Sequence, residues 1–113
     1  MDYRIINLKE HSPTVEQALA IFQINLDACR LEGVKVIKII HGYGSHGVGG
    51  GICSSLRNKL KTMKKNGEIK DYLIGIEWDI SNERCIRLLE NLKDCYGDED
   101  LGKQNPGITI VIL

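Results

Sequence analysis

Several features that would assign a function outright are missing from this chain. Aromatic residues make up 5% of its 113 residues, only two residues are proline, and the formal net charge at pH 7 is zero. A neutral total provides no global field that draws a protein toward nucleic acid or a membrane. No apolar run approaches the ~20 residues that span a bilayer, so no membrane segment is expected. The length suits one domain, residues 1–113, with a core that can fold alone.

Signals for metal binding and secretion are also lacking. The four cysteines, at positions 29, 53, 85 and 95, show no Cys-x-x-Cys or other metal-ligand spacing. The first residues have none of the marks of a signal peptide. We therefore expect a cytoplasmic protein with reduced thiols and with no metal or cofactor. Cys29 and Cys85 fall on apolar helix faces and are expected in the core.

Charge is unevenly distributed along the chain. Residues 57–70 contain six basic side chains and one acidic one, whereas residues 77–100 contain eight acidic and three basic side chains. A basic helix face is, on its own, more often a solvated surface than a binding surface. The asymmetry therefore needs a second signal before it indicates a partner.

Apolar periodicity predicts alternating strands and helices. Strands are expected at residues 3–9, 34–40, 72–74 and 108–113. Helices are expected at about 14–33, 52–66 and 81–96. Ser12 or Thr14 can cap the first helix, and Asp79 or Ser81 the third, whose apolar stripe ends at Tyr96. The order strand-helix-strand-helix-strand-helix-strand predicts an α/β fold with helices packed on a small, largely parallel or mixed sheet.

Glycine is concentrated in one loop. Six of the twelve glycines lie within residues 41–51, between the strand at 34–40 and the second helix. Glycine costs backbone entropy on folding, and close approach of an anion to bare N–H groups at a helix N-terminus is the plainest reason to accept that cost. Two histidines in the loop, His41 and His46, add charge or proton transfer near neutral pH.

Other interpretations of this loop are weaker. Residues 42–47 match Gly-x-Gly-x-x-Gly, and Glu68 or Asp71 follows at the distance of a ribose-binding acid. The third glycine, however, lies too far from the helix, and the chain is too short for two mononucleotide halves. A Walker A loop would need a Lys-Ser or Lys-Thr pair after the glycines. Metal binding by the two histidines lacks nearby acids or cysteines, and a purely structural loop remains an alternative.

Three segments together resemble a known family. The sequence His41-Gly42-Tyr43-Gly44, at the end of a strand and followed by glycines and a helix, resembles the His-Gly-x-Gly signature of Smr (small MutS-related) domains. Residues 14–18, Thr-Val-Glu-Gln-Ala, are similar to the Thr-x-Glu-x-Ala helix start of that family's first motif. Residues 105–111 are similar to its Gly-x-Thr-x-Val last strand. The resemblance covers about residues 5–113, and the longer loop with residues 75–78 is similar to a bacterial single-domain branch.

The resemblance implies a two-layer α/β sandwich with a mixed sheet of about four strands and three helices, which binds DNA or RNA. It places the phosphate-facing site at His41 and the glycine loop, and we expect the basic second helix to extend it. The expected phosphate-binding residues are Gly42, Tyr43, Gly44, Ser45, Gly47, Gly49, Gly50, Gly51, Arg57, Lys59, Lys61, Lys64 and Lys65. Such binding would weaken steeply with salt.

Some members of the family also cut DNA or RNA, which would make His41, with His11 or His46, a metal-independent catalytic set. A positioned base contributes ~10²–10⁴-fold to such a reaction. The carboxylate of the first motif is missing here, because Lys9 replaces it in an ungapped match. In a shifted match Asn7 replaces the carboxylate and Lys9 replaces the histidine.

The family's arginine near the start of the second helix is also displaced. Cys53 stands at its usual position, and Arg57 follows one turn later. We therefore expect binding with weak or absent nuclease activity. An endonuclease remains the first alternative, and a module for a small phosphorylated ligand or a protein partner the second. The structural alternative for His11 is a loop histidine that caps the first helix.

Overall fold

The computed structural model of the protein describes residues 2–43 and 50–113. Its elements, in chain order, are β1 (Tyr3–Asn7), α1 (Val15–Leu31), β2 (Val36–Ile40), α2 (Gly50–Lys65), β3 (Asp71–Ile74), the 3₁₀ turn η1 (Gly75–Glu77), α3 (Glu83–Asn91), the 3₁₀ turn η2 (Lys93–Cys95) and β4 (Ile108–Ile112). The predicted α/β class and the predicted order of strands and helices are confirmed.

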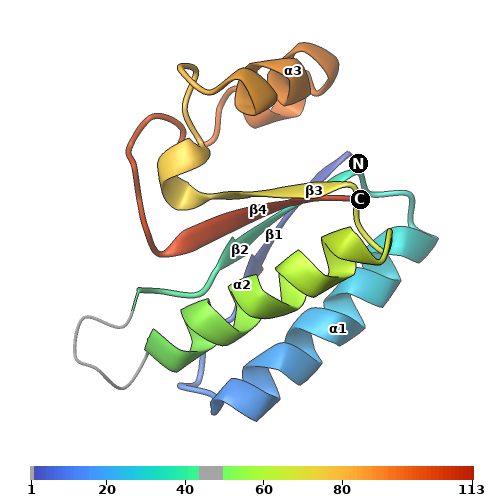
Figure 1. Ribbon diagram of the computed structural model, residues 1–113, viewed down its shortest axis with the longest axis vertical. Helices are drawn as coiled ribbons and strands as arrows, with labels where there is room; N and C mark the ends of the chain where they lie inside the picture. The colour runs from blue at the N-terminus through green and yellow to red at the C-terminus, as the bar shows by residue number, and fades with distance from the viewer. Residues whose placement is uncertain (1, 44–49) are drawn as a thin grey trace.

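The four strands form one mixed sheet in the order β1-β2-β4-β3. β1 and β2 are parallel, and β4 lies antiparallel to both β2 and β3. The carboxyl ends of β1 and β2 therefore lie beside the amino end of β4, at one end of the sheet. Both α1 and α2 begin at this end (Figure 1). β1 and β3 are the two edge strands.

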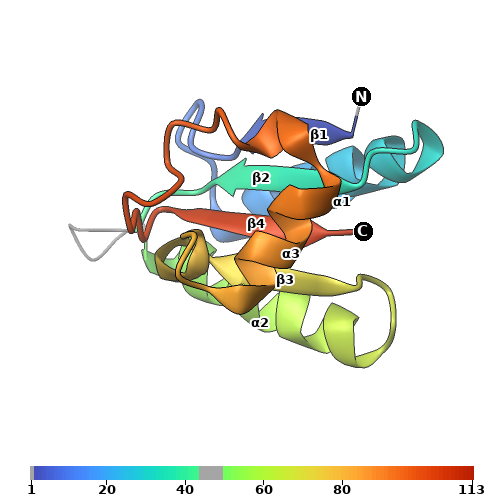
Figure 2. The same cartoon turned by 90° about the horizontal axis from the view of Figure 1, so that it is seen from above.

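Helices cover both faces of the sheet. α1 and α2 pack on one face, and α3 with η2 packs on the other (Figures 1 and 2). Two separate apolar clusters result, one containing Phe22, Ile37 and Leu56, and the other containing Val36 and Trp78. The expected α/β sandwich with a mixed four-stranded sheet and three helices is confirmed, and α3 gives the second face of the sheet its own cover. The physical reason is that the central strand β2 is buried on both sides, so each face requires a cover.

The helix boundaries differ from expectation at two places. Thr14 caps α1 as expected and forms a capping box with Gln17, whose backbone N–H lies 3.1 Å from the Thr14 Oγ1. The cap of α3 is Asn82 rather than Asp79 or Ser81. The turn η2 separates Tyr96 from α3. Tyr96 is 56% exposed and is not part of the apolar stripe of α3.

All four cysteines are buried and free, which confirms the core positions of Cys29 and Cys85. No helix in the described part of the chain is long and apolar enough to cross a membrane.

Candidate functional site

His41 lies directly after β2, on the face of the sheet that α2 covers, and its side chain is only 2% exposed. Its Nδ1 lies 2.6 Å from the Gly42 carbonyl, and its Nε2 lies 2.8 Å from the Thr109 hydroxyl. Arg57 donates from Nε to that same hydroxyl oxygen at 3.2 Å. These partners fit a neutral ring that donates from Nδ1 and accepts the Thr109 proton at Nε2.

Burial lowers the pKa of His41 below its ordinary value, and the nearby Arg57 guanidinium lowers it further, against the opposing effect of the hydrogen bond with Gly42. A neutral, fully bonded and buried imidazole positions its neighbours. In this arrangement it offers no free nitrogen to solvent.

The backbone at the site is fixed by contacts between β2 and the segment before β4. The N–H groups of His41 and Gly42 each donate to the Gly107 carbonyl at 3.0 Å. Arg57 also donates from Nη2 to the Pro106 and Ile108 carbonyls, at 3.1 and 3.2 Å. One arginine from α2 therefore holds the entry to β4 in place beside the end of β2.

Gly42 brings the loop after β1 into the same site. Its φ of +73° is in the region that favours glycine. A Cβ added there would lie 3.3 Å from Cδ of Lys9. The Lys9 side chain therefore runs over Gly42, where a larger residue would push it away. Tyr43, next in the chain, is 60% exposed.

The other predicted site residues separate into three groups. Residues 44–49 lie outside the described part of the chain, and these include Gly44, Ser45, His46, Gly47 and Gly49. His11 is exposed between β1 and α1 with a φ of 65°. It does not cap α1, since Thr14 does so. The catalytic roles expected for the three histidines stay predictions. Gly50 and Gly51 form the first turn of α2, two residues earlier than expected.

The basic residues of α2 that were predicted to bind phosphate lie on two different sides of the helix. At ~100° per residue, Arg57, Lys61 and Lys64 lie within an arc of about 60°, on the side toward β3. Lys59 lies roughly 160° from Arg57 around the helix, on the side away from this row. A single strand of phosphates along α2 would therefore meet the first three, and the phosphate-binding role expected for Lys59 stays a prediction.

The sequence did not predict Thr109 as a site residue. It placed Lys9 only in the two alternative matches to the first motif of the family. Thr109 is fully buried in an otherwise apolar strand, and this break in the apolar pattern was the available signal. For Lys9 there was no local signal, because its contact depends on how the loops after β1 and β2 meet in space.

A second polar group on the α3 face connects to this site. Lys38, whose side chain is 1% exposed, lies 2.8 Å from Asp98 and 2.5 Å from Asp100. Asn105 donates to Asp100 at 3.0 Å and accepts from the Gly107 N–H at 2.8 Å. Gly107 is the residue whose carbonyl accepts from the backbone of His41 and Gly42, so the buried lysine supports the site through three bonded residues, Asp100, Asn105 and Gly107.

Tyr3 and Trp78 complete the surroundings of Asp98. The Tyr3 hydroxyl donates to Asp98 at 2.5 Å, and the Trp78 indole donates to it at 2.9 Å. Burial would raise the pKa of Asp98, but the bonds from Lys38, Tyr3 and Trp78 outweigh it and hold that pKa below its ordinary value. The side chain is therefore a charged acceptor whose oxygens are bonded on several sides.

The fold agrees with comparisons to known proteins. The profile of the Smr domain matches residues 6–73, more than half of the chain. The chain belongs to the Smr domain family. The crystal structure of the Smr domain of MutS2 from Thermus thermophilus has a similar fold, with a TM-score of 0.59 and 18% sequence identity. The similarity covers 97% of this chain and 96% of that chain. No curated protein matches this chain in sequence.

Proposed function

We propose that the chain binds nucleic acid through the phosphate backbone, at the end of the sheet where β2, the glycine loop and α2 meet. The observation that carries the proposal is the convergence of two cations on this end. Lys9 crosses Gly42, and Arg57 is bonded to Thr109, the partner of His41. Membership of the Smr family adds support, because the resemblance implies nucleic-acid binding.

The start of α2 supplies the second part of the argument. The first turn of this 16-residue helix contains no acidic residue. The N–H groups of a helix start and the helix dipole favour an anion. A phosphate at this end would interact with these backbone donors. The exposed ring of Tyr43 is placed to stack on a base or a sugar of the same strand.

We further propose that the chain binds without efficient cleavage. His41 has both ring nitrogens occupied and is buried, and the carboxylate of the first motif is replaced. Asn7, which occupies that place in one match, uses its carbonyl oxygen to accept from the Lys9 N–H at 2.8 Å. It holds the turn that carries Lys9 and has no acidic group to act as a base.

The test is anisotropy binding of labelled single-stranded, duplex and branched DNA and RNA at two salt concentrations, with magnesium and with chelator. Lys9→Ala should weaken binding and reduce the slope of log K against log salt by about 0.7–0.9, the effect of one phosphate contact. Lys35→Ala is the matched control, because Lys35 is exposed at the opposite end of β2. This control should bind as the unchanged protein does.

Three other outcomes would change the proposal. Cleavage that survives chelator and disappears in His41→Ala would favour the endonuclease alternative. Thermal stabilisation by nucleotides but not by oligonucleotides would favour a small phosphorylated ligand. An absence of salt-sensitive binding to every nucleic acid, at low salt, would contradict nucleic-acid binding altogether.

A further inference from the structure

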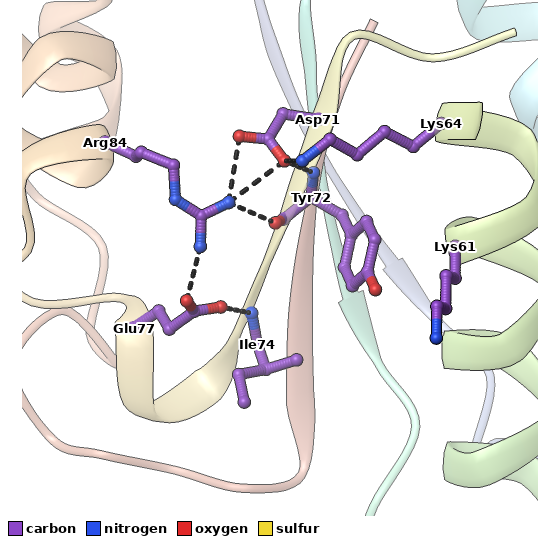
Figure 3. A pocket seen from close by; sticks show the side chains of 7 residues that line it. All are labelled: Lys61, Lys64, Asp71, Tyr72, Ile74, Glu77 and Arg84. Atoms are coloured by element: carbon purple, nitrogen blue, oxygen red, sulfur yellow. Dashed lines mark hydrogen bonds and ion pairs between the residues drawn. The ribbon is translucent and has the colours of Figure 1, made fainter. Parts of the chain in front are cut away.

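A cleft of about 420 Å³ lies beside the edge strand β3, between α2 and α3. Figure 3 shows the seven residues that line it: Lys61, Lys64, Asp71, Tyr72, Ile74, Glu77 and Arg84. It lies away from His41, and none of its β3, η1 or α3 residues was predicted as part of a site. Lys61 and Lys64 belong to both places, because the row that starts at Arg57 on α2 ends in this cleft.

The exposed backbone of β3 inside the cleft is already bonded. The Tyr72 N–H donates to Asp71 at 2.8 Å, and the Ile74 N–H donates to Glu77 at 3.0 Å. Arg84 donates to the Tyr72 carbonyl at 3.3 Å. These side chains block the edge strand against pairing with another strand. A ligand of the cleft must therefore be recognised by side chains, which argues against a peptide added to the sheet.

The charges in the cleft are arranged so that one rim is free to bind an anion. Arg84 pairs with Asp71 at 2.9 Å and also with Glu77, and Lys64 pairs with Asp71 at 2.9 Å. In Figure 3 the Lys61 ammonium stands beside the Tyr72 ring on the α2 side, away from these pairs. The two carboxylates disfavour an anion deep in the cleft, so a phosphate belongs on the α2 rim at Lys61.

The floor of the cleft beside that rim suits a flat, uncharged group. Tyr72 and Ile74 line it, and the Tyr72 ring is half-buried, with one side packed on the core under α2. An aromatic ring beside a cation is the combination that binds a base and the phosphate attached to it. A nucleotide therefore satisfies both parts of the surface, whereas inorganic phosphate satisfies only one.

We propose that this cleft binds one nucleotide of a single strand, with its phosphate on Lys61 and its base against Tyr72. The inference rests on the proposed function and extends it, because the strand would run from the His41 end along the row of Arg57, Lys61 and Lys64. The seven steps along the helix from Arg57 to Lys64 span about 10 Å. That length is about three steps of a stacked strand at ~3.4 Å per nucleotide.

The experiment measures anisotropy binding of a labelled dinucleotide and of labelled single-stranded DNA and RNA of about 12 nucleotides, a length within the range of known site sizes. With the longer strand, Lys61→Ala should reduce the salt slope by about 0.7. Tyr72→Leu should weaken binding of the longer strand by about fivefold or more. Both variants should bind the dinucleotide as the unchanged protein does, because its single step of ~3.4 Å is shorter than the ~6 Å of helix between Arg57 and Lys61.

Two controls separate binding from folding and from nearby charge. Lys35→Ala removes the same charge at the opposite end of β2 and should leave the binding of both strands unchanged. Tyr72→Phe keeps the ring and should retain binding, whereas a merely structural role for the Tyr72 hydroxyl would make this variant as weak as Tyr72→Leu. Thermal unfolding of each variant reports whether the fold is intact.

The outcomes distinguish this inference from the proposed function. If Lys9→Ala weakens binding while Lys61→Ala and Tyr72→Leu behave like Lys35→Ala, the cleft is not a nucleotide site and the proposed function stands. If the unchanged protein binds no strand, both proposals are wrong. Equal effects of Lys61→Ala on the short and long strands would also contradict the cleft, because they would show an electrostatic effect without a separate site.

Discussion

The Lys38 ammonium lies 2.5 Å from the Asp100 carboxylate, an ion pair that joins the central strand of the sheet to the acidic segment before β4. Asp100 is bonded to Asn105, and Asn105 to the Gly107 N–H. The carbonyl of Gly107 then receives the two backbone N–H groups of the His41 site. A buried charge on one face of the sheet therefore sets the position of a loop on the other face.

Replacing Lys38 should be among the most damaging single changes outside the apolar core. In Lys38→Met the Asp98 and Asp100 carboxylates lose their shared cation, and breaking a buried pair on one side costs about 3–5 kcal/mol. Urea unfolding measures the change. Lys35→Met, at an exposed site just before β2, should stay within about 0.5 kcal/mol of the unchanged protein.

A double variant tests whether the loss of stability comes from the buried carboxylates that no longer have a cation beside them. Lys38→Met with Asp98→Asn should recover part of the loss, because removing both partners leaves less uncompensated charge. If Lys38→Met alone costs less than about 1 kcal/mol, the pair does not have the role we assign to it.

Acid should weaken the fold through the same cluster. Bonds from Lys38 hold the pKa of both Asp98 and Asp100 below the ordinary value of 3.8, against the opposing effect of burial. Carboxyl groups with a lowered folded pKa add stability that is complete above the ordinary pKa. This stability is lost as the pH falls through the folded pKa. We expect the free energy of unfolding to decline as the pH falls below about 5.

Asp98→Asn should lower stability at pH 7 and flatten that acid decline, measured by urea unfolding at a series of pH values. Asp94→Asn is the comparison, since Asp94 is exposed in the same acidic segment. An unchanged acid decline in Asp98→Asn would show that other carboxyl groups cause it.

The same cluster marks the limit of what the sequence could predict. The apolar periods of α1 and α2 placed their core residues correctly, because a 3.6-residue repeat is local information. The residues after Tyr96 are polar and acidic, a composition typical of an exposed turn, yet Asp98 has a side chain only 2% exposed. Its partner Lys38 is 60 residues away in the chain, and no local pattern indicates that a lysine within an apolar strand has a buried acid as partner.

In the candidate site, too, local motifs were predictable and contacts between distant residues were not. The glycines and His41 could be recognised from the motif, and α2 from its apolar stripe. The bond between His41 and Thr109 depends on β4 lying antiparallel beside β2, with Ile39 opposite Thr109. A strand at the end of the chain could equally have paired at an edge of the sheet, so the environment that makes His41 a buried, neutral residue could not be derived beforehand.

Gly75 provides a steric test of the segment that supports the site. A Cβ added at Gly75 would lie 1.6 Å from the Asn105 carbonyl oxygen, which belongs to the backbone and cannot rotate away. Gly75→Ala should therefore destabilise the protein by about 1–3 kcal/mol or more and weaken nucleic-acid binding through displacement of Asn105. Gly97→Ala, where an added Cβ meets nothing within 4 Å, should change stability by less than about 0.5 kcal/mol. Equal stability of the two variants would contradict the close packing of Gly75.

His41 should make stability depend on pH near neutrality. Its pKa in the folded protein is below the ordinary value of 6.5, mainly because the ring is buried. The unfolded chain therefore binds a proton at a higher pH than the native state does, so stability is complete above pH 6.5 and falls as the pH drops toward the folded pKa.

Urea unfolding between about pH 7.5 and 5 should show this loss of stability. It should be smaller in His41→Gln and unchanged in His11→Gln, because His11 is exposed. Thr109→Val, which removes the hydroxyl bonded to His41 and Arg57, should cost about 1–3 kcal/mol at pH 7.5. If His41→Gln shows the same loss of stability as the unchanged protein, the imidazole is not the buried, neutral group that connects β2 to β4.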